Sequence, residues 1–314
     1  MRYFLALCVG LAILCPRSVF ASTTTRATLP ESPLIQTATS TSVQEFDPEQ
    51  YGLAAAYALT PKTRRELYAW NADNVWPLAS LTKLVAASVW QGKTVPWRTI
   101  MTIQKRDEVG GGRLRVPVGT KIRFEDLWYA SITASANNAA MMVARAMGVT
   151  PKQYVALMQK EAKKVGATSA VFAEPSGMSE ENRATAKDMA LLADRAFAFR
   201  PLQKAASTAT YTVNILNRTP KNRPIKTTNL LLSDDPDVWV LAGKTGYLEA
   251  SRYNFVGWFR PVGIDGKPET GKDVLVVIFG APTKEQSFAA AKHLAQSLWL
   301  SHATFSRTNA SRKP

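Results

Sequence analysis

Strand-like segments occur at both ends of the folded part of this chain, and the region between them has helical character. The strand-like segments are short, apolar and rich in β-branched or aromatic residues: 52–59, 66–70, 238–241, 254–259 and 274–279. Residues of these kinds favour strands, and the first two segments flank a polar turn, as the strands of a hairpin do. This order predicts an α/β (α+β) sandwich. Both chain ends build one antiparallel sheet flanked by helices, with a helical subdomain inserted between them.

Helix signals fill the middle of the chain and return after the last strand. Apolar residues with helical spacing occur in five segments: 123–130, 137–147, 151–165, 185–199 and 285–300. Pro151 stands at a first helical position and Gly166 follows the end of the same segment, which is the usual asymmetry of helix ends. A further helix is expected from Ser80 to about Gly92. We expect the last helix to pack on the sheet.

The composition changes near both termini. Met1 and Arg2 precede an apolar run that ends in small residues up to Ala21, the pattern of a secretory signal peptide. The segment after it is rich in serine and threonine, which is typical of disorder. We therefore expect four parts: a signal peptide (1–21), a disordered linker (22–47), one folded domain (48–300) and a disordered basic tail (301–314).

The signal segment is unlike an anchor. Its apolar run covers residues 3–15, whereas a membrane span needs about 20 residues. Bulky Leu14 before Cys15 also disfavours lipid attachment there. The chain ends soon after its last helix, so neither a further β-rich domain nor a C-terminal anchor is expected. We expect a protein secreted across the inner membrane, periplasmic or extracellular, and associated with the cell wall.

The net charge of the chain is +15, which favours contact with anionic material. Secretion disfavours nucleic acid as the partner and favours a peripheral contact with an anionic envelope polymer through the basic surface. Scattered solubilising lysines are the simpler alternative. The sequence does not indicate an oligomeric state.

Cysteine and histidine chemistry is excluded or disfavoured. Cys8 and Cys15 both lie in the signal segment, so the secreted chain has no thiol. The two histidines, His293 and His302, are near the C-terminus and lack metal-ligand spacing. No metal and no cofactor is expected, and a catalytic serine would need a base other than histidine, for which lysine is the strongest candidate.

Ser80 and Lys83 supply such a pair. Residues three apart on a helix share a face, so the Lys83 amine can reach the Ser80 hydroxyl. Burial or a second cation can lower the pKa of a lysine enough for it to act as a base. By itself the pattern is more typical of a capping serine beside a solvated lysine.

Two later motifs carry complementary groups. Ser135-Ala136-Asn137 lies at the junction of two helices, where side chains can point into a cleft. Lys244-Thr245-Gly246 opens a strand-like stretch, and glycine in an edge strand lets a peptide approach the backbone closely.

In the order Ser-x-x-Lys, Ser-x-Asn, Lys-Thr-Gly, these motifs resemble those of the penicillin-recognising serine hydrolases. The finer resemblance is to the low-molecular-mass penicillin-binding proteins, the D-alanyl-D-alanine carboxypeptidases and endopeptidases, and it extends from about residue 51 to about residue 300. Four further stretches support it: 117–120, 174–178, 185–190 and 227–231. The resemblance implies a β-lactamase/transpeptidase-like fold over 48–300 and peptidoglycan stem peptides and β-lactams as partners.

The resemblance also implies roles for individual residues. Ser80 would attack the carbonyl between two D-amino acids and form an acyl-enzyme, with Lys83 as its base. The remaining roles are a proton relay to the leaving amine (Ser135), a hydrogen bond to the substrate backbone (Asn137), binding of the substrate carboxylate (Lys244, Thr245, next to Gly246) and an oxyanion hole from two backbone N–H groups (Ser80, Tyr247). Lys244 would also hold down the pKa of Lys83.

The chain departs from the family pattern after Gly246. Relatives commonly continue with Tyr or His, Thr and then an Ala-Gly pair, whereas this chain has Tyr247-Leu248-Glu249-Ala250-Ser251-Arg252. The bulkier residues leave carboxypeptidase and endopeptidase activity both open. Arg252 is a further candidate for carboxylate binding.

Two other functions remain as alternatives. A serine β-lactamase of the same fold would need a carboxylate to activate water, and Glu174 is the candidate in the corresponding loop, although Ser176-Gly177-Met178 replaces the usual Glu-Leu-Asn. A non-catalytic peptidoglycan-binding relative would keep the basic surface without needing Lys83.

Overall fold

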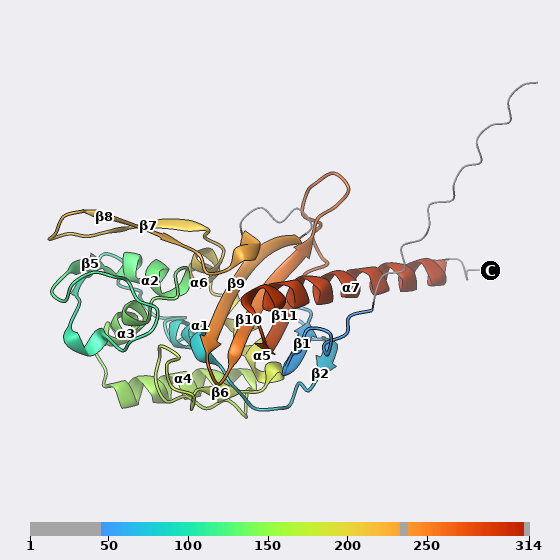
Figure 1. The fold of residues 1–314 in the computed structure, drawn as a ribbon, viewed down its shortest axis with the longest axis horizontal. Coiled ribbons are helices and arrows are strands. Elements are labelled where there is room, and N and C mark those ends of the chain that lie inside the picture. Colours follow the sequence, from blue (N-terminus) through green and yellow to red (C-terminus); the bar gives the residue numbers. More distant parts are fainter. Residues whose placement is uncertain (1–44, 233–237, 311–314) are drawn as a thin grey trace, which may run out of the picture. The chain divides into compact units, whose positions relative to one another are not determined.

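The computed structural model describes residues 45–232 and 238–310, the last nine of these by their backbone alone. The predicted signal peptide and most of the predicted linker lie outside the described residues. A five-stranded antiparallel sheet has the order β2-β1-β11-β10-β9 (Figure 1). Its strands come from both chain ends, which confirms the predicted sheet: β1 (Ala55–Leu59), β2 (Glu66–Trp70), β9 (Val238–Leu248), β10 (Arg252–Pro261) and β11 (Val274–Ala281).

Each face of this sheet packs against helices. Successive side chains of a strand point to opposite faces. Along β11, Val276 and Ile278 accordingly pack in the cluster under helix α7 (Lys284–Ala310), whereas Leu275 and Val277 pack in the cluster that contains the other helices. Each fully buried aliphatic side chain of this kind contributes about 1.5–3 kcal/mol. The helical covering of both faces is what the sequence predicted.

The helices of the second cluster form the predicted inserted region between β2 and β9. They are α1 (Thr82–Ser88), α2 (Phe124–Ile132), α3 (Asn137–Arg145), α4 (Pro151–Val165), α5 (Ala186–Phe197) and α6 (Arg200–Ala206). The sequence predicted one segment up to about residue 199 and missed α6, which has proline near its first position, where that residue is tolerated.

Short strands also went unpredicted in this region. They form three two-stranded sheets: β3 (Trp76–Pro77) with β6 (Arg183–Ala184), β4 (Ile100–Thr102) with β5 (Lys121–Arg123), and β7 (Thr210–Asn214) with β8 (Asn222–Lys226). Hairpin β7–β8 buries only Val213 and Ile225, so its sequence has too few apolar residues for the usual alternating signal.

Two boundaries differ most from the sequence predictions. The sequence predicted a strand that ends at residue 241 and a second strand-like stretch that opens at Lys244, whereas the structure has one continuous strand, β9, because Gly243 and Gly246 mark close packing rather than a strand end. Helix α7 was expected to end at residue 300 before a disordered tail. In the structure α7 continues to Ala310, and no glycine or proline interrupts it before that point. None of the helices in the described part of the chain has the length and apolar character of a membrane span.

Candidate active site

Ser80 and Lys83 meet at the start of α1. Ser80 lies in the 3₁₀ helix η1 (Ala79–Leu81), which leads directly into α1. The Lys83 Nζ donates a hydrogen bond to Ser80 Oγ at 2.7 Å and another to Asn137 Oδ1 at 2.6 Å, and a third goes to the Ser176 carbonyl. These bonds use all three N–H groups of the ammonium form. The neutral amine would keep two of them and turn its lone pair to the Ser80 hydroxyl proton.

The backbone at Ser80 differs from the first turn of a helix that the sequence predicted. Ala79 has a φ of +49°, a left-handed backbone conformation that residues other than glycine rarely adopt. Two glycines pack closely against this turn. A Cβ at Gly246 would lie 2.9 Å from the Leu78 carbonyl oxygen, and a Cβ at Gly177 would overlap the Ala79 carbonyl. The tight turn is therefore held from both sides, and it sets the position of the Ser80 hydroxyl.

Two buried lysines face the site. Lys83 and Lys244 each have a relative exposure of 1%. Burial lowers the pKa of Lys83 to about 7, an effect that the Glu174 carboxylate partly opposes. Burial also lowers the pKa of Lys244, and the charge of Lys83 lowers it further. The sequence attributed the lowered pKa of Lys83 to Lys244, whereas here burial is the cause.

Ser135 lies between α2 and α3, at the helix junction that the sequence indicated. Its φ is +58°, so this short connection is also in the left-handed region. The Lys244 Nζ donates to Ser135 Oγ at 2.8 Å and to the Thr245 carbonyl at 2.9 Å. Each of the two serines of the site thus has its own buried lysine.

Asn137 links Lys83 to a glycine-rich loop. Besides accepting from Lys83, its side chain donates to the Gly110 carbonyl at 2.9 Å, and its backbone N–H donates to the Gly112 carbonyl at 2.7 Å. The amide nitrogen has two hydrogens, so one N–H can still reach a substrate.

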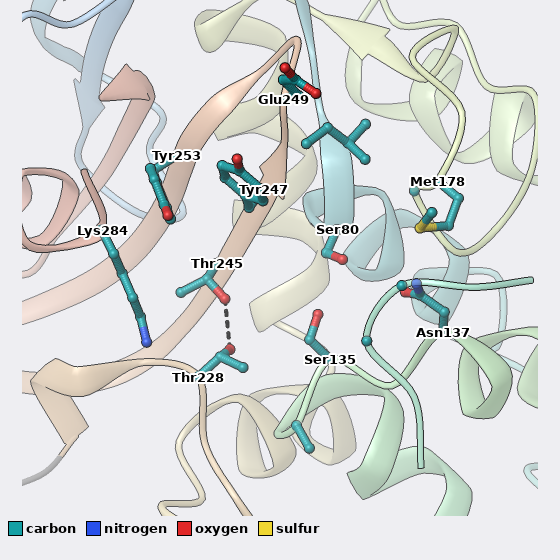
Figure 2. Close-up of a pocket in the computed structure, with 15 residues that line it drawn as sticks. Ser80, Ser135, Asn137, Met178, Thr228, Thr245, Tyr247, Glu249, Tyr253 and Lys284 are labelled. Atoms are coloured by element: carbon teal, nitrogen blue, oxygen red, sulfur yellow. Dashed lines mark hydrogen bonds between the residues drawn. The ribbon is translucent and has the colours of Figure 1, made fainter. Parts of the chain in front are cut away.

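Ser80, Ser135 and Asn137 border a cleft of about 500 Å³ beside the edge strand β9 (Figure 2). Thr245 shares a hydrogen bond of 2.6 Å with Thr228 on the cleft wall. Tyr247 is half exposed, and its ring packs on that of Tyr253 with centroids 4.5 Å apart. Leu248 and Glu249 also line the cleft. An edge strand with a free side at such a cleft can pair with an extended peptide.

Lys284 was missed by the sequence reasoning. It is the first residue of α7 and the one basic side chain among the residues that line the cleft, on the same side as Thr228 and Thr245 (Figure 2). Its position follows from the packing of α7 on the sheet, so no local motif could have indicated it. Arg252, the candidate from sequence, follows the turn after β9 and is not among the lining residues.

Glu174 forms hydrogen bonds within its own loop and does not line the cleft. Its carboxylate accepts hydrogen bonds from the backbone N–H groups of Ser176, Gly177 and Met178 at 2.6–2.7 Å, and from the Asn182 amide at 2.7 Å. Burial favours the neutral carboxyl, but these bonds outweigh burial and lower the pKa of Glu174. The ionised carboxylate thereby shapes the loop that presents the Ser176 carbonyl to Lys83.

The arrangement suits nucleophilic chemistry. A buried lysine with a pKa near 7 lies within hydrogen-bond reach of a serine, and a second serine–lysine pair lies on the other side of the cleft. Within residues 45–232 and 238–301, no group of three or more acidic, histidine or cysteine side chains is placed to hold a metal ion.

Comparisons with known proteins give consistent matches. A family model described as D-alanyl-D-alanine carboxypeptidase matches residues 44–282. The chain is 30% identical over 211 residues to a D-alanyl-D-alanine endopeptidase of Haemophilus influenzae, covering 66% of this chain and 70% of the relative. A D-alanyl-D-alanine endopeptidase of Escherichia coli is 29% identical over 237 residues, with 74% and 72% covered. Among solved structures, a mutant of the Streptomyces K15 DD-transpeptidase has the same fold, with a TM-score of 0.71 over 79% of this chain and 98% of its own, at 22% identity.

Proposed function

This chain belongs to the D-alanyl-D-alanine carboxypeptidase family, and on that premise we propose that Ser80 is its acylated nucleophile and Lys83 the base. The family resemblance seen in the motifs is confirmed, and the chain is a serine-type D-alanyl-D-alanine peptidase of peptidoglycan stem peptides. The observation that carries the proposal is the contact of 2.7 Å between Ser80 Oγ and the Lys83 Nζ, whose pKa burial lowers to about 7.

The proposed reaction has two steps. The neutral Lys83 amine takes the Ser80 proton as Oγ attacks the carbonyl carbon between the two D-residues. The backbone N–H groups of Ser80 and Tyr247 are proposed to stabilise the oxyanion. Collapse of the tetrahedral intermediate breaks the C–N bond, and the proton that Lys83 took passes through Ser135, which Lys244 orients, to the leaving amine. Water then attacks the ester carbonyl as the neutral Lys83 takes one of its protons, and Lys83 returns that proton to Ser80 Oγ as the ester C–O bond breaks.

Substrate placement follows from β9 and the cleft wall. The extended peptide would pair with the free side of the edge strand, with Asn137 donating to its backbone. Its carboxylate would lie by Thr245, where Lys284 supplies the positive charge. Lys244 is less suited to that task, since it is buried and bonded to Ser135.

We propose that the preferred bond is a cross-link, so that the enzyme acts as an endopeptidase. Two relatives, each matched by this chain over more than two thirds of its own length, carry that activity in their names. Tyr247, Leu248 and Glu249 would shape the wall of the cleft along β9.

Two alternatives are disfavoured by particular contacts. A β-lactamase would need a carboxylate free to activate water, but the Glu174 carboxylate accepts six hydrogen bonds from its own loop. A non-catalytic binder would have no use for a lysine buried against a serine. We further propose that the protein is secreted and works in the periplasm or outside the cell, in contact with the wall.

Incubation with defined muropeptides tests the reaction. We expect the folded protein to split a cross-linked muropeptide dimer into its two monomers, identified by mass, and to release terminal D-alanine from a pentapeptide monomer more slowly. Ser80→Ala should abolish both products. If neither substrate is processed, or if a chromogenic cephalosporin is turned over rapidly instead, the proposed function is wrong.

A further inference from the structure

A chain of hollows leads away from the active-site cleft. The cleft shares Gly111, Gly112 and Ala134 with a neighbouring hollow of about 840 Å³. That hollow in turn shares residues 115–117 with a third one of about 370 Å³. We name the second and third hollows together the arginine groove, after the arginines that line it: Arg113, Arg115, Arg218 and Arg223.

The two segments that build the arginine groove carry charge of one sign. Residues 109–123 and 207–229 contain no aspartate or glutamate. They contain eight basic residues: Arg113, Arg115, Lys121, Arg123, Arg218, Lys221, Arg223 and Lys226. A hollow lined by positive charge concentrates the electric field and attracts an anionic ligand.

Among the described residues, most of this charge has no acidic side chain within ion-pair distance. Arg113 approaches Glu108 at 3.9 Å, a long contact for an exposed pair. For Arg115 and Arg223, the described part of the chain offers no acidic side chain within ion-pair distance. Their guanidinium groups are therefore available to an external carboxylate.

The walls of the arginine groove are fixed to each other. Hairpin β7–β8 bridges to β5 through Ile122 and Ile215 (Figure 1). Asn217 accepts from the Lys121 backbone at 2.7 Å and donates to the Gly119 carbonyl at 3.0 Å, and Arg218 donates to the Val118 carbonyl at 3.1 Å. The hairpin, which the sequence did not predict, thus has a defined place as one wall.

We propose that the arginine groove binds the carboxylates of an acidic peptide strand that continues from the cleft, namely the second stem peptide of a cross-linked substrate. Arginine suits this role because its planar guanidinium binds carboxylates through two parallel hydrogen bonds. The inference rests on the proposed function and extends it. Occupation of the arginine groove would favour cross-linked over single stem peptides.

The test compares the double variant Arg115→Ala/Arg223→Ala with the control Arg65→Ala/Lys152→Ala. The control removes two exposed positive charges that do not line the arginine groove. Two exposed charge contacts at about 0.5 kcal/mol each predict a fall of about fivefold in kcat/KM for the cross-linked dimer. Acylation by a labelled penicillin, which fills only the cleft, should stay within about twofold of wild type. The control should match wild type in both assays.

Several outcomes would overturn this inference. One is unchanged cleavage of the dimer by the double variant. This outcome counts against the inference whether or not the double variant has also lost binding to a phosphodiester polymer, which is measured in parallel. Another is an equal fall in dimer cleavage and penicillin acylation, which would show damage to the cleft itself. If the wild-type protein is acylated by penicillin but splits no muropeptide, the proposed function is wrong, and the inference that rests on it is wrong as well.

Discussion

At the scale of single residues, the account depends on the protonation of Lys83. A lysine in water is protonated at neutral pH and cannot accept a proton from serine. Burial lowers the pKa of Lys83 to about 7, so an appreciable fraction is neutral near physiological pH. The Glu174 carboxylate opposes this shift and limits it.

The pH dependence of acylation follows from this pKa. Only neutral Lys83 is a base, so the acylation rate constant for a penicillin should fall about tenfold for each pH unit below about 7 and level off above it. The measurement is the rate of covalent labelling between pH 5 and pH 9. A rate that is flat across this range, or that rises as pH falls, would show that Lys83 is not the base.

The sequence indicated the local part of this chemistry. Helical spacing predicted that Ser80 and Lys83 meet, and the order of the three motifs, through the family resemblance, added Ser135. Lys284 could not be found in this way, because it reaches the cleft only through the packing of α7. The sequence offered burial or a second cation as the cause of a lowered pKa at Lys83, and only the fold shows that burial is the larger effect.

At the scale of elements, the turn at Ala79 and the loop 174–182 hold each other in place. The Glu174 carboxylate accepts hydrogen bonds from backbone N–H groups of its loop, and Gly177 of that loop lies against the Ala79 carbonyl. The sequence presented Glu174 as a possible catalytic carboxylate. The structure shows that its hydrogen bonds stabilise the loop that faces Lys83.

Gly177→Ala tests this contact, with Gly166→Ala as its control. Gly177 and Gly166 have nearly the same positive φ, +83° and +81°, but a Cβ at Gly166 would meet nothing within 4 Å. The control should cost about 1 kcal/mol of unfolding free energy from backbone strain alone. Gly177→Ala should cost about 3 kcal/mol or more and slow penicillin acylation strongly, because the turn carrying Ser80 must shift. Equal effects of the two substitutions in denaturant unfolding would contradict the packing described.

At the scale of the whole molecule, the site exists because both chain ends build one sheet. Strand β9 brings Lys244 close to Lys83 on α1 and to Ser135 between α2 and α3, although more than one hundred residues separate Lys244 from each of them. The sequence predicted this architecture because strand and helix patterns are strong where side chains are buried. Hairpin β7–β8 was missed because it is mostly exposed, and the arginine groove that it borders was missed with it.

The central claim is that Ser80, activated by Lys83, forms an acyl-enzyme in the folded protein. The most direct measurement is the intact mass of the protein after exposure to a penicillin, with the adduct mapped by peptide mass analysis. We predict one adduct per chain on Ser80 in wild type, none in Ser80→Ala, and none in protein unfolded before exposure. An adduct that persists in folded Ser80→Ala, or wild-type protein that is folded and stays unmodified, would contradict the account.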